Sequence, residues 1–558
     1  MDKSTLSNYG WIVIVVLVLS VMTALATPFG EYIEKGVKNT TEGLFNTSEA
    51  ALNVVEMTGG SGTFDENDET EKDATMNPSG VIPEGATYTH YINFDGYMHE
   101  DGWPYIYTYD DVVQLSAGDE FPENVSLGDI YTYDEYQYCY GFEWCCDTWS
   151  YICECGDEIE TLGWAVRFIG ENNPGLMLDS INGKPIVSLG NTFSYIDTLT
   201  TVENLTIPKT VVSMYCAFGF TPITNEVANL KIPQSVKNVS RMFLNCKQLT
   251  DMSGLILPNN TKDAHYLFSG CSSLTKAPVL PDSITDIQGI FQNCTSLEVA
   301  PKLPQKTTNM MYAFFGCTTL IETPEIPSKV TNMMYAFYKC EKITVAPILP
   351  NAVNQLRYAF AYCISMSSYV GSADAEGDFT NYIIPSDATD WSSLFQYCEK
   401  MIKAPVIPET VENLYGAFWY CTALTEAPNI PNSVTNLELT FAGCSSLNTY
   451  RGNTDENGDF RNYIISNNVT TLSNTFAHCS QLVYAPDLSN ATNVINLIRT
   501  FDGCTSLTDT ITINTTLVTK NKVAYCLVDT TQPIVLTGLC PILEDIAKTS
   551  TANNITIQ

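Results

Sequence analysis

The sequence is poor in positive charge, and this scarcity excludes one large class of partner. The 558 residues include 27 Lys and Arg against 62 Asp and Glu, which gives a formal net charge of -35 at pH 7. A protein with this charge repels the phosphates of nucleic acid and the anionic head groups of lipids. Nucleic acid is therefore not an expected partner.

Histidine and the recognised catalytic motifs are also scarce. The chain has four histidines, His90, His99, His265 and His478, and none lies in a catalytic pattern. The sequence contains no G-x-S-x-G elbow, no H-E-x-x-H motif and no G-x-x-x-x-G-K-[ST] loop, which are typical of hydrolases, zinc proteases and nucleotide-binding proteins. We therefore expect a protein without enzymatic activity and without a cofactor.

The chain has one long apolar run, at its N-terminus. Residues 11–26 read WIVIVVLVLSVMTALA, after Lys3 and before Pro28. About 16 apolar residues are short for a membrane span, which needs about 20, although flanking residues could extend the run. The triplet from Ala24 to Ala26 also fits a small-x-small cleavage site. Residues 1–28 are therefore predicted as a transmembrane anchor or a signal segment.

Composition changes divide the residues that follow. Residues 29–84 are predicted as a helical stalk and an acidic flexible linker, because Gly, Ser, Asp and Glu dominate the linker and leave little to bury. In residues 85–200 aromatic residues alternate with polar ones, as in YIYTYDDVV and IYTYDEYQYCYGF. This period of two is typical of half-buried strands. We predict a β-rich domain or N-terminal cap there, and a C-terminal cap or tail at 529–558.

Residues 201–528 contain a repeat anchored by a phenylalanine three residues before a cysteine. The unit reads F-x-x-C-x-x-L-x-x-A-P-x-[LI]-P-x-x-V-T-N, and counting from Phe218 to Phe501 predicts twelve coils. A single coil cannot bury its own apolar edge, so neighbouring coils are expected to stack at about 4.8 Å per strand. The pairs expected to form a buried ladder are Phe268 and Cys271, Phe291 and Cys294, Phe314 and Cys317, Phe337 and Cys340, Phe360 and Cys363, and Phe418 and Cys421.

These units resemble the BspA-like, or treponemal, class of bacterial leucine-rich repeats. The segments from Leu205 to Pro208 and from Leu230 to Pro233 match that pattern best, and the resemblance covers residues 205–527. It implies an elongated right-handed solenoid of short β-strands with turns or short helices. It also implies a membrane-anchored or secreted protein of the bacterial cell surface, which binds an unknown protein or glycan.

Cysteine is abundant, with 19 residues, and an exported protein with so many would usually be disulfide-bonded. The ladder cysteines take the same place in successive coils, where small polarizable side chains stack well, so we predict reduced, buried thiols. A separate cluster has a tight spacing that differs from that of common zinc sites. Local disulfides, free thiols and a metal site all remain open for it: Cys139, Cys145, Cys146, Cys153 and Cys155.

Two coils carry matching insertions, YVGSADAEGDFTNYII at 369–384 and YRGNTDENGDFRNYII at 450–465. Each places oxygen ligands at positions 1, 3 and 5, as a calcium loop would, but lacks the remaining ligands of an EF-hand. The weak calcium candidates are Asp374, Glu376, Asp378, Asp455, Asn457 and Asp459. The alternatives are acidic turns without a ligand, or loops that contact a partner.

Two functions from different classes remain. The first is a surface adhesin, whose residues just before each A-P pair vary and should face solvent: Lys276, Val299, Glu322, Val345, Lys403, Glu426 and Tyr484. The second is a pilin-like subunit of a surface filament with a repeat head, because an apolar helix followed by a stalk and a large head has that shape. The chain lacks a G-F processing site and an acidic residue at the fifth place of a mature helix, so the adhesin is preferred.

Overall fold

The computed structural model describes residues 88–90, 105–107, 113–115, 130–133, 136–140, 142–145, 148–151, 164–172, 174–175, 177–181, 183–451, 463–548 and 555–558. Before residue 164, only Tyr136 and Tyr138 have described side chains. The chain divides into two units, Met1–Asp110 and Asp111–Gln558. In the first unit, β1 (Tyr88–His90) pairs antiparallel with β2 (Tyr105–Tyr107).

The predicted anchor, stalk and linker at 1–84 lie outside the described residues. Within the ranges above, no helix combines the length and the apolar character that crossing a bilayer requires.

The second unit begins with a six-stranded sheet in the order β3-β4-β5-β8-β10-β9. Its strands are β3 (Val113–Leu115), β4 (Ile130–Tyr133), β5 (Tyr136–Tyr140), β8 (Trp164–Phe168), β9 (Ser180–Ile181) and β10 (Lys184–Ser188). A separate hairpin joins β6 (Phe142–Cys145) and β7 (Thr148–Tyr151). The period of two holds in β5, where Tyr136 and Tyr138 share a buried face.

This sheet leads directly into the solenoid. Ser188 at the end of β10 forms a parallel bridge with Ser213, and the ring of Phe168 in β8 lies 5.5 Å from that of Phe193. The sheet thus packs against the first coil of the array, the place at which a cap shields an apolar edge.

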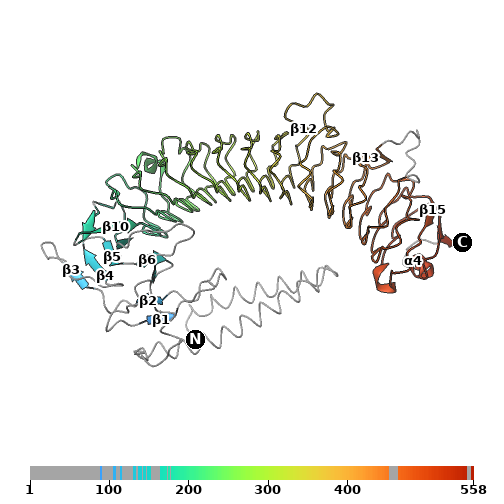
Figure 1. Ribbon diagram of the computed structural model, residues 1–558, viewed down its shortest axis with the longest axis horizontal. Helices are drawn as coiled ribbons and strands as arrows, with labels where there is room; N and C mark the ends of the chain where they lie inside the picture. Colours follow the sequence, from blue (N-terminus) through green and yellow to red (C-terminus); the bar gives the residue numbers. More distant parts are fainter. Residues whose placement is uncertain are drawn as a thin grey trace. The chain divides into compact units, whose positions relative to one another are not determined.

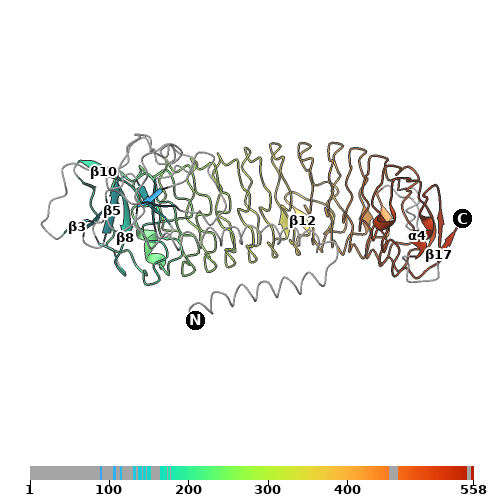
Figure 2. The same cartoon turned by 90° about the horizontal axis from the view of Figure 1, so that it is seen from below.

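The coils then stack side by side, as Figure 1 and Figure 2 show. Most neighbouring coils are joined by isolated parallel β-bridges. Two-residue parallel strands pair β11 (Val345–Ala346) with β12 (Ser368–Tyr369) and β13 (Glu426–Ala427) with β14 (Thr449–Tyr450). The short helices are η2 (Asn225–Asn229), η4 (Lys520–Lys522) and α4 (Leu543–Lys548). A parallel sheet of β15 (Asp509–Thr512), β16 (Ile534–Thr537) and β17 (Ile555–Ile557) ends the chain.

The chain turns tightly around each F-x-x-C motif because the residues two places before and two places after the phenylalanine adopt left-handed backbone angles. In the coil of Phe337 these residues are Tyr335, with φ 56°, and Lys339, with φ 59°. Such angles are unfavourable for residues with a Cβ atom. The next coil offsets this cost, since the amide of Phe337 donates to the carbonyl of Ala359 at 2.9 Å and that of Tyr335 donates to Arg357 at 2.9 Å.

The core is a continuous stack of phenylalanine rings beside a ladder of thiols. Phe337 lies 5.5 Å from Phe314 and 5.8 Å from Phe360, with nearly parallel rings. The thiol of Cys340 donates to the carbonyl of Phe314 at 3.1 Å, and the same bond recurs in every coil from Cys246 to Cys504. All twelve residues of the expected ladder are fully buried, and these cysteines are free thiols.

The prediction of twelve coils is wrong, because the described part of the chain contains about 16 turns. Phe193 stacks on Phe218 at 5.1 Å although Ile196 replaces the cysteine of its unit. Beyond Phe501, the buried Leu527 takes the place of the phenylalanine, because the amide of Phe501 donates at 2.9 Å to the carbonyl of Cys526, the residue just before it. The count from Phe218 to Phe501 missed these coils at the two ends, and the predicted boundaries at 201 and 528 fall inside the stacked array.

Candidate interaction surfaces of the solenoid

The arm that carries the A-P pairs has the solvent-facing stripe expected from the sequence. Lys276, Val299 and Glu322 are exposed, and Val345, Lys403, Glu426 and Tyr484 are half-buried. Neighbours in this stripe pair across coils, as Lys276 does with Asp251 at 2.8 Å. Solvent screens an exposed ion pair of this kind, so it contributes little to stability and does not by itself define a binding site.

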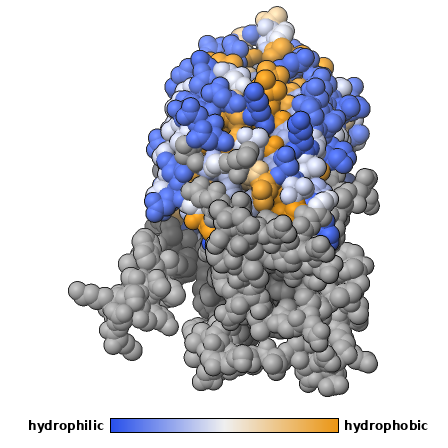
Figure 3. All heavy atoms as spheres, turned by 90° about the vertical axis from the view of Figure 1, so that its left-hand side faces the viewer, coloured by the Kyte–Doolittle hydropathy of each residue, from blue (hydrophilic) through white to orange (hydrophobic). Residues whose placement is uncertain are grey.

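The same arm exposes a series of β-branched residues. Ile256, Val279, Ile348 and Ile383 are each at least 66% exposed, which is unusual for residues of this type. Figure 3 shows hydrophobic residues gathered in a band between hydrophilic flanks at one end of the solenoid. The stripe and these residues make the A-P arm a mixed surface of charges and small apolar side chains.

Two of the three candidate carboxylates of the first insertion, Asp374 and Asp378, are occupied by protein partners, and the third, Glu376, is exposed. Asp374 accepts the hydroxyl of Tyr369 at 2.5 Å and the amide of Asn381 at 3.1 Å. Asp378 lies 3.2 Å from the ammonium of Lys403. No group of three metal-ligating side chains converges within the described ranges, and the second set, Asp455, Asn457 and Asp459, lies outside them. These contacts favour the acidic-turn interpretation, and calcium binding stays a prediction.

Both insertions are anchored in the same way. Tyr382 and Tyr463 are buried, and their hydroxyls donate to the carbonyls of Pro347 and Pro428 at 2.8 and 2.6 Å. Arg451 at the start of the second insertion donates to Glu426 at 3.2 Å and to the carbonyl of Ala404. In Figure 1 the segment that follows β12 projects from the outer edge of the coils.

A second surface, formed by the outward residues of the F-x-x-C turns, carries a cluster of aromatic side chains. We call it the aromatic patch. Its members come from five successive coils and are all half-buried: Tyr312, Phe315, Tyr335, Tyr338, Tyr358, Tyr362, Tyr397, Trp419 and Tyr420. Because residues on either side of each buried phenylalanine turn outward, the coils place these rings in rows along the solenoid.

The rings of the patch stack on one another from coil to coil. Tyr335 lies 4.6 Å from Tyr358, with an interplanar angle of 6°. Tyr397 lies 4.5 Å from Tyr362 and 4.7 Å from Tyr420, at angles of 11° and 12°. Stacked pairs of this kind each contribute about 0.5 to 1.5 kcal/mol beyond area burial. The rows are thus held rigidly before any partner arrives.

The hydroxyls of the patch are available to a partner. Those of Tyr312, Tyr335, Tyr358, Tyr397 and Tyr420 have no hydrogen-bond partner among the described residues, and none is a buried unsatisfied atom. Unpartnered atoms that are not buried face solvent. Burial and the neighbouring phenols raise the pKa of Tyr338 to about 12 and also raise the pKa values of Tyr312, Tyr335 and Tyr397, so these four phenols stay neutral at ordinary pH.

Two cations lie on the same turns. The ammonium of Lys339 is 5.8 Å from the ring centroid of Tyr338 and 5.7 Å from that of Tyr362. Arg357 precedes Tyr358 and lies 3.6 Å from Asp390. The two Lys339 distances are typical of cation–π contacts, which leave the outer side of the cation open to solvent.

The sequence analysis did not predict the aromatic patch, because it assigned the F-x-x-C motif only a buried ladder of phenylalanine and cysteine. The signal was present in the motifs MMYAFFGC, MMYAFYKC, LRYAFAYC and LYGAFWYC, where aromatic residues flank the buried phenylalanine. These residues are 23 or 35 positions apart in the sequence, so no local pattern indicates that they are in contact. Only the register between coils shows it.

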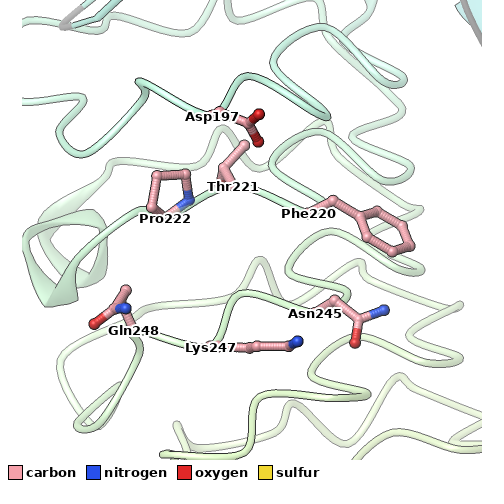
Figure 4. A pocket seen from close by; sticks show the side chains of 7 residues that line it. All are labelled: Asp197, Phe220, Thr221, Pro222, Asn245, Lys247 and Gln248. Carbon is pink, nitrogen blue, oxygen red and sulfur yellow. The ribbon is translucent and has the colours of Figure 1, made fainter. Parts of the chain in front are cut away.

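Two further candidate sites in the described part of the chain, His265 and a surface cavity, do not bring together a set of catalytic side chains. His265 lies 2.6 Å from Asp263, whose pKa stays low despite burial because His265 hydrogen-bonds it. A shallow cavity of about 440 Å³ crosses three coils and is lined by Asp197, Phe220, Thr221, Pro222, Asn245, Lys247 and Gln248. Figure 4 shows the Asp197 and Lys247 side chains on opposite sides of it. No nucleophile with an adjacent base lines this cavity.

The second cysteine cluster is only partly described. Cys139 lies in β5 and Cys145 in β6, whereas Cys146, Cys153 and Cys155 lie outside the described residues. Its disulfide, thiol and metal alternatives therefore all remain open.

Comparison with known protein families agrees with the geometry of the coils. The family model described as BspA type leucine rich repeat region matches residues 190–298, 261–376 and 375–455, with six copies. The coils of residues 190–455 belong to the BspA-type leucine-rich-repeat family. The resemblance drawn from the F-x-x-C and I-P motifs is thereby confirmed.

Solved structures of other leucine-rich-repeat proteins are similar to this BspA-type array. A leucine-rich repeat protein from Bacteroides ovatus is 20% identical, with 76% of this chain and 99% of that chain covered and a TM-score of 0.45. A leucine rich cell surface protein from Faecalibacterium prausnitzii is 21% identical, with 69% and 94% covered and a TM-score of 0.38. A leucine-rich repeat protein from T. pallidum is 21% identical over 32% of this chain and 83% of that chain, with a TM-score of 0.26. No curated protein matches the chain.

Proposed function

We propose that the protein is a non-enzymatic binding or adhesion protein of a bacterial cell surface, and that the aromatic patch is its binding surface. The observation that carries the proposal is the row of preorganised, half-buried rings with solvent-facing hydroxyls across five coils. Clustered aromatic residues are enriched at binding hot spots, and rigid ones lose little entropy when a partner docks.

The location at the surface is supported by the BspA-type family of the array and by the apolar run at 11–26. Protease added to intact cells should therefore digest the chain from about residue 88 onward. Protection in intact cells, with digestion after lysis, would contradict an exposed location. The pilin-like alternative also stays a prediction, and protein recovered in sheared filaments would support it.

The binding role is tested with the purified full chain on panels of host proteins and glycans. We expect Tyr335→Ala combined with Tyr358→Ala to weaken binding to any ligand found by at least about tenfold, as for hot-spot residues. The matched control replaces two exposed apolar residues of the A-P arm, Val279→Ala and Ile348→Ala, and should change the affinity less than about twofold. Loss of binding in the control alone would move the binding surface to the A-P arm.

A further inference from the structure

We propose that the surface cavity near the N-terminal end of the array binds a sugar residue of a neutral glycan. The cavity crosses the coils of Phe193, Phe218 and Phe243, whereas the aromatic patch begins at the coil of Phe314. It is therefore a second site, beyond the proposed function. Three features support it: the way in which the cavity forms, its aromatic wall and its polar groups.

The cavity forms where a ladder of hydroxyl groups is interrupted. Four residues after the buried phenylalanine, the hydroxyl of Thr295 donates to the equivalent carbonyl of the preceding coil, that of Ser272, at 3.2 Å. The same bond recurs in four later coils. In the coils of the cavity this place is taken by Asp197, Pro222 and Lys247. None of these has a hydroxyl, so the carbonyls of Asp197 and Pro222 receive no such bond and a cavity of about 440 Å³ remains.

Phe220 supplies an aromatic wall. Its ring is half-buried, and the ring of Tyr195 stacks on it at 4.4 Å with an interplanar angle of 9°. This stack covers one face of the ring, so the opposite face is the one that remains for a ligand. The face of an aromatic ring carries negative potential, which attracts the weakly positive C–H groups of a sugar ring. Figure 4 shows Phe220 and Asn245 at the same end of the cavity.

The polar groups of the cavity suit a ligand with several hydroxyls. The hydroxyl of Thr221 is already used, since it donates to the carbonyl of Phe218 at 2.7 Å. The side chains of Asp197, Asn245 and Lys247 form no hydrogen bond with the residues that the structure describes. A carboxylate accepts, an ammonium donates and an amide does both. Sugar hydroxyls donate and accept as well, so one kind of ligand group satisfies all three side chains.

Asp197 and Lys247 also indicate the charge of the ligand. They lie on opposite sides of the cavity, and both are exposed. Opposite charges favour neither an anion nor a cation, and solvent screens their attraction for the two ends of a zwitterion. Sites for apolar molecules are enclosed and mainly apolar, whereas five of the seven residues that line this shallow cavity are polar. A neutral sugar that stays partly hydrated fits these features.

The test is saturation-transfer NMR on the full chain. The probes are the methyl glycosides of mannose, galactose and N-acetylglucosamine, with leucine as a zwitterion for comparison. We expect at least one glycoside to bind and leucine not to bind.

Pro222→Thr combined with Lys247→Thr restores the ladder hydroxyls, so it should fill the cavity and abolish glycoside binding. The fold should tolerate the change, because an amide at this place elsewhere donates to the carbonyl two residues earlier, as that of Thr422 does to Tyr420 at 2.9 Å. An unchanged melting temperature checks this. The matched control, Glu341→Thr with Ile364→Thr, changes the same place in two other coils and should leave glycoside binding unchanged.

Two further variants test the wall and the charges. Phe220→Leu keeps an apolar side chain but removes the ring, and it should weaken glycoside binding about threefold to tenfold. Asp197→Asn with Lys247→Gln keeps groups that donate and accept hydrogen bonds, and it should weaken glycoside binding less than about threefold.

Failure of every glycoside to bind would overturn the proposal. Glycoside binding that survives in the Pro222 and Lys247 variant would also overturn it, since the sugar would then bind elsewhere. If leucine binds and the Asp197 and Lys247 variant abolishes its binding, the cavity is a zwitterion site and the proposal is wrong. A larger glycan held in this cavity would be lost in the Pro222 and Lys247 variant and kept in the Tyr335 and Tyr358 variant, which distinguishes failure of this proposal from failure of the proposed function.

Discussion

Replacing Phe337 by alanine should open the middle of the solenoid while its ends stay closed. The ring is fully buried and lies between Phe314 and Phe360 at 5.5 and 5.8 Å. Removal of a buried phenylalanine ring costs about 3 to 5 kcal/mol, a transfer contribution and a cavity contribution together. The upper part of that range is expected, since the backbone bonds from Tyr335 to Arg357 and from Phe337 to Ala359 prevent neighbouring coils from collapsing into the cavity.

Hydrogen exchange is the suitable measurement, because each coil contacts mainly its neighbours and the loss should stay local. Protection should fall between residues 317 and 363 and persist near Phe218 and Phe501. The matched control is Phe315→Ala, which removes the same ring from a half-buried position of the patch and should cost about 1 to 2 kcal/mol. Equal effects of the two substitutions, or unchanged protection around Phe337, would refute the packing argument.

Three further predictions concern the thiols and the first insertion. Cys340→Ala removes the donor to the carbonyl of Phe314 and should lower the stability by about 1 to 2 kcal/mol in urea unfolding, whereas Cys340→Ser keeps a donor and should lose less; the reverse order would mean that the bond contributes nothing. Burial raises the pKa of Cys246 to about 11 and that of Cys363 to about 12. Their contribution to stability is therefore complete below about pH 9, where unfolded thiols are protonated, and is lost as the pH rises through 11 to 12, so the melting temperature should fall over that interval; a flat profile would contradict the burial of the ladder. Millimolar calcium should produce no heat in isothermal titration, because Asp374 and Asp378 already bind Tyr369, Asn381 and Lys403; a saturating heat signal would revive the calcium hypothesis.

Several features were predictable from the chain because they repeat locally. The F-x-x-C period predicted stacked coils and buried Phe337 and Cys340, since a side chain that recurs at one place in every coil must meet its own copies. The A-P pair predicted an extended arm with solvent-facing residues such as Lys276. The coil count failed at the two ends of the array, where Ile196 replaces the cysteine of one coil and Leu527 replaces the phenylalanine of another.

The sequence by itself thus determined the repeat family, the apolar ladder and the excess of negative charge, because each follows from residue types at fixed spacing. Only the tertiary structure decided where Tyr335, Tyr358 and Tyr397 lie relative to one another. Tyr335 stacks on Tyr358, and Tyr397 stacks on Tyr362 and Tyr420, because the register of the coils and their left-handed turns place these rings side by side. Separations of 23 and 35 residues become ring contacts of about 5 Å, as between Tyr335 and Tyr358 and between Tyr362 and Tyr397, only through the backbone bonds that stack the coils and not through any local pattern.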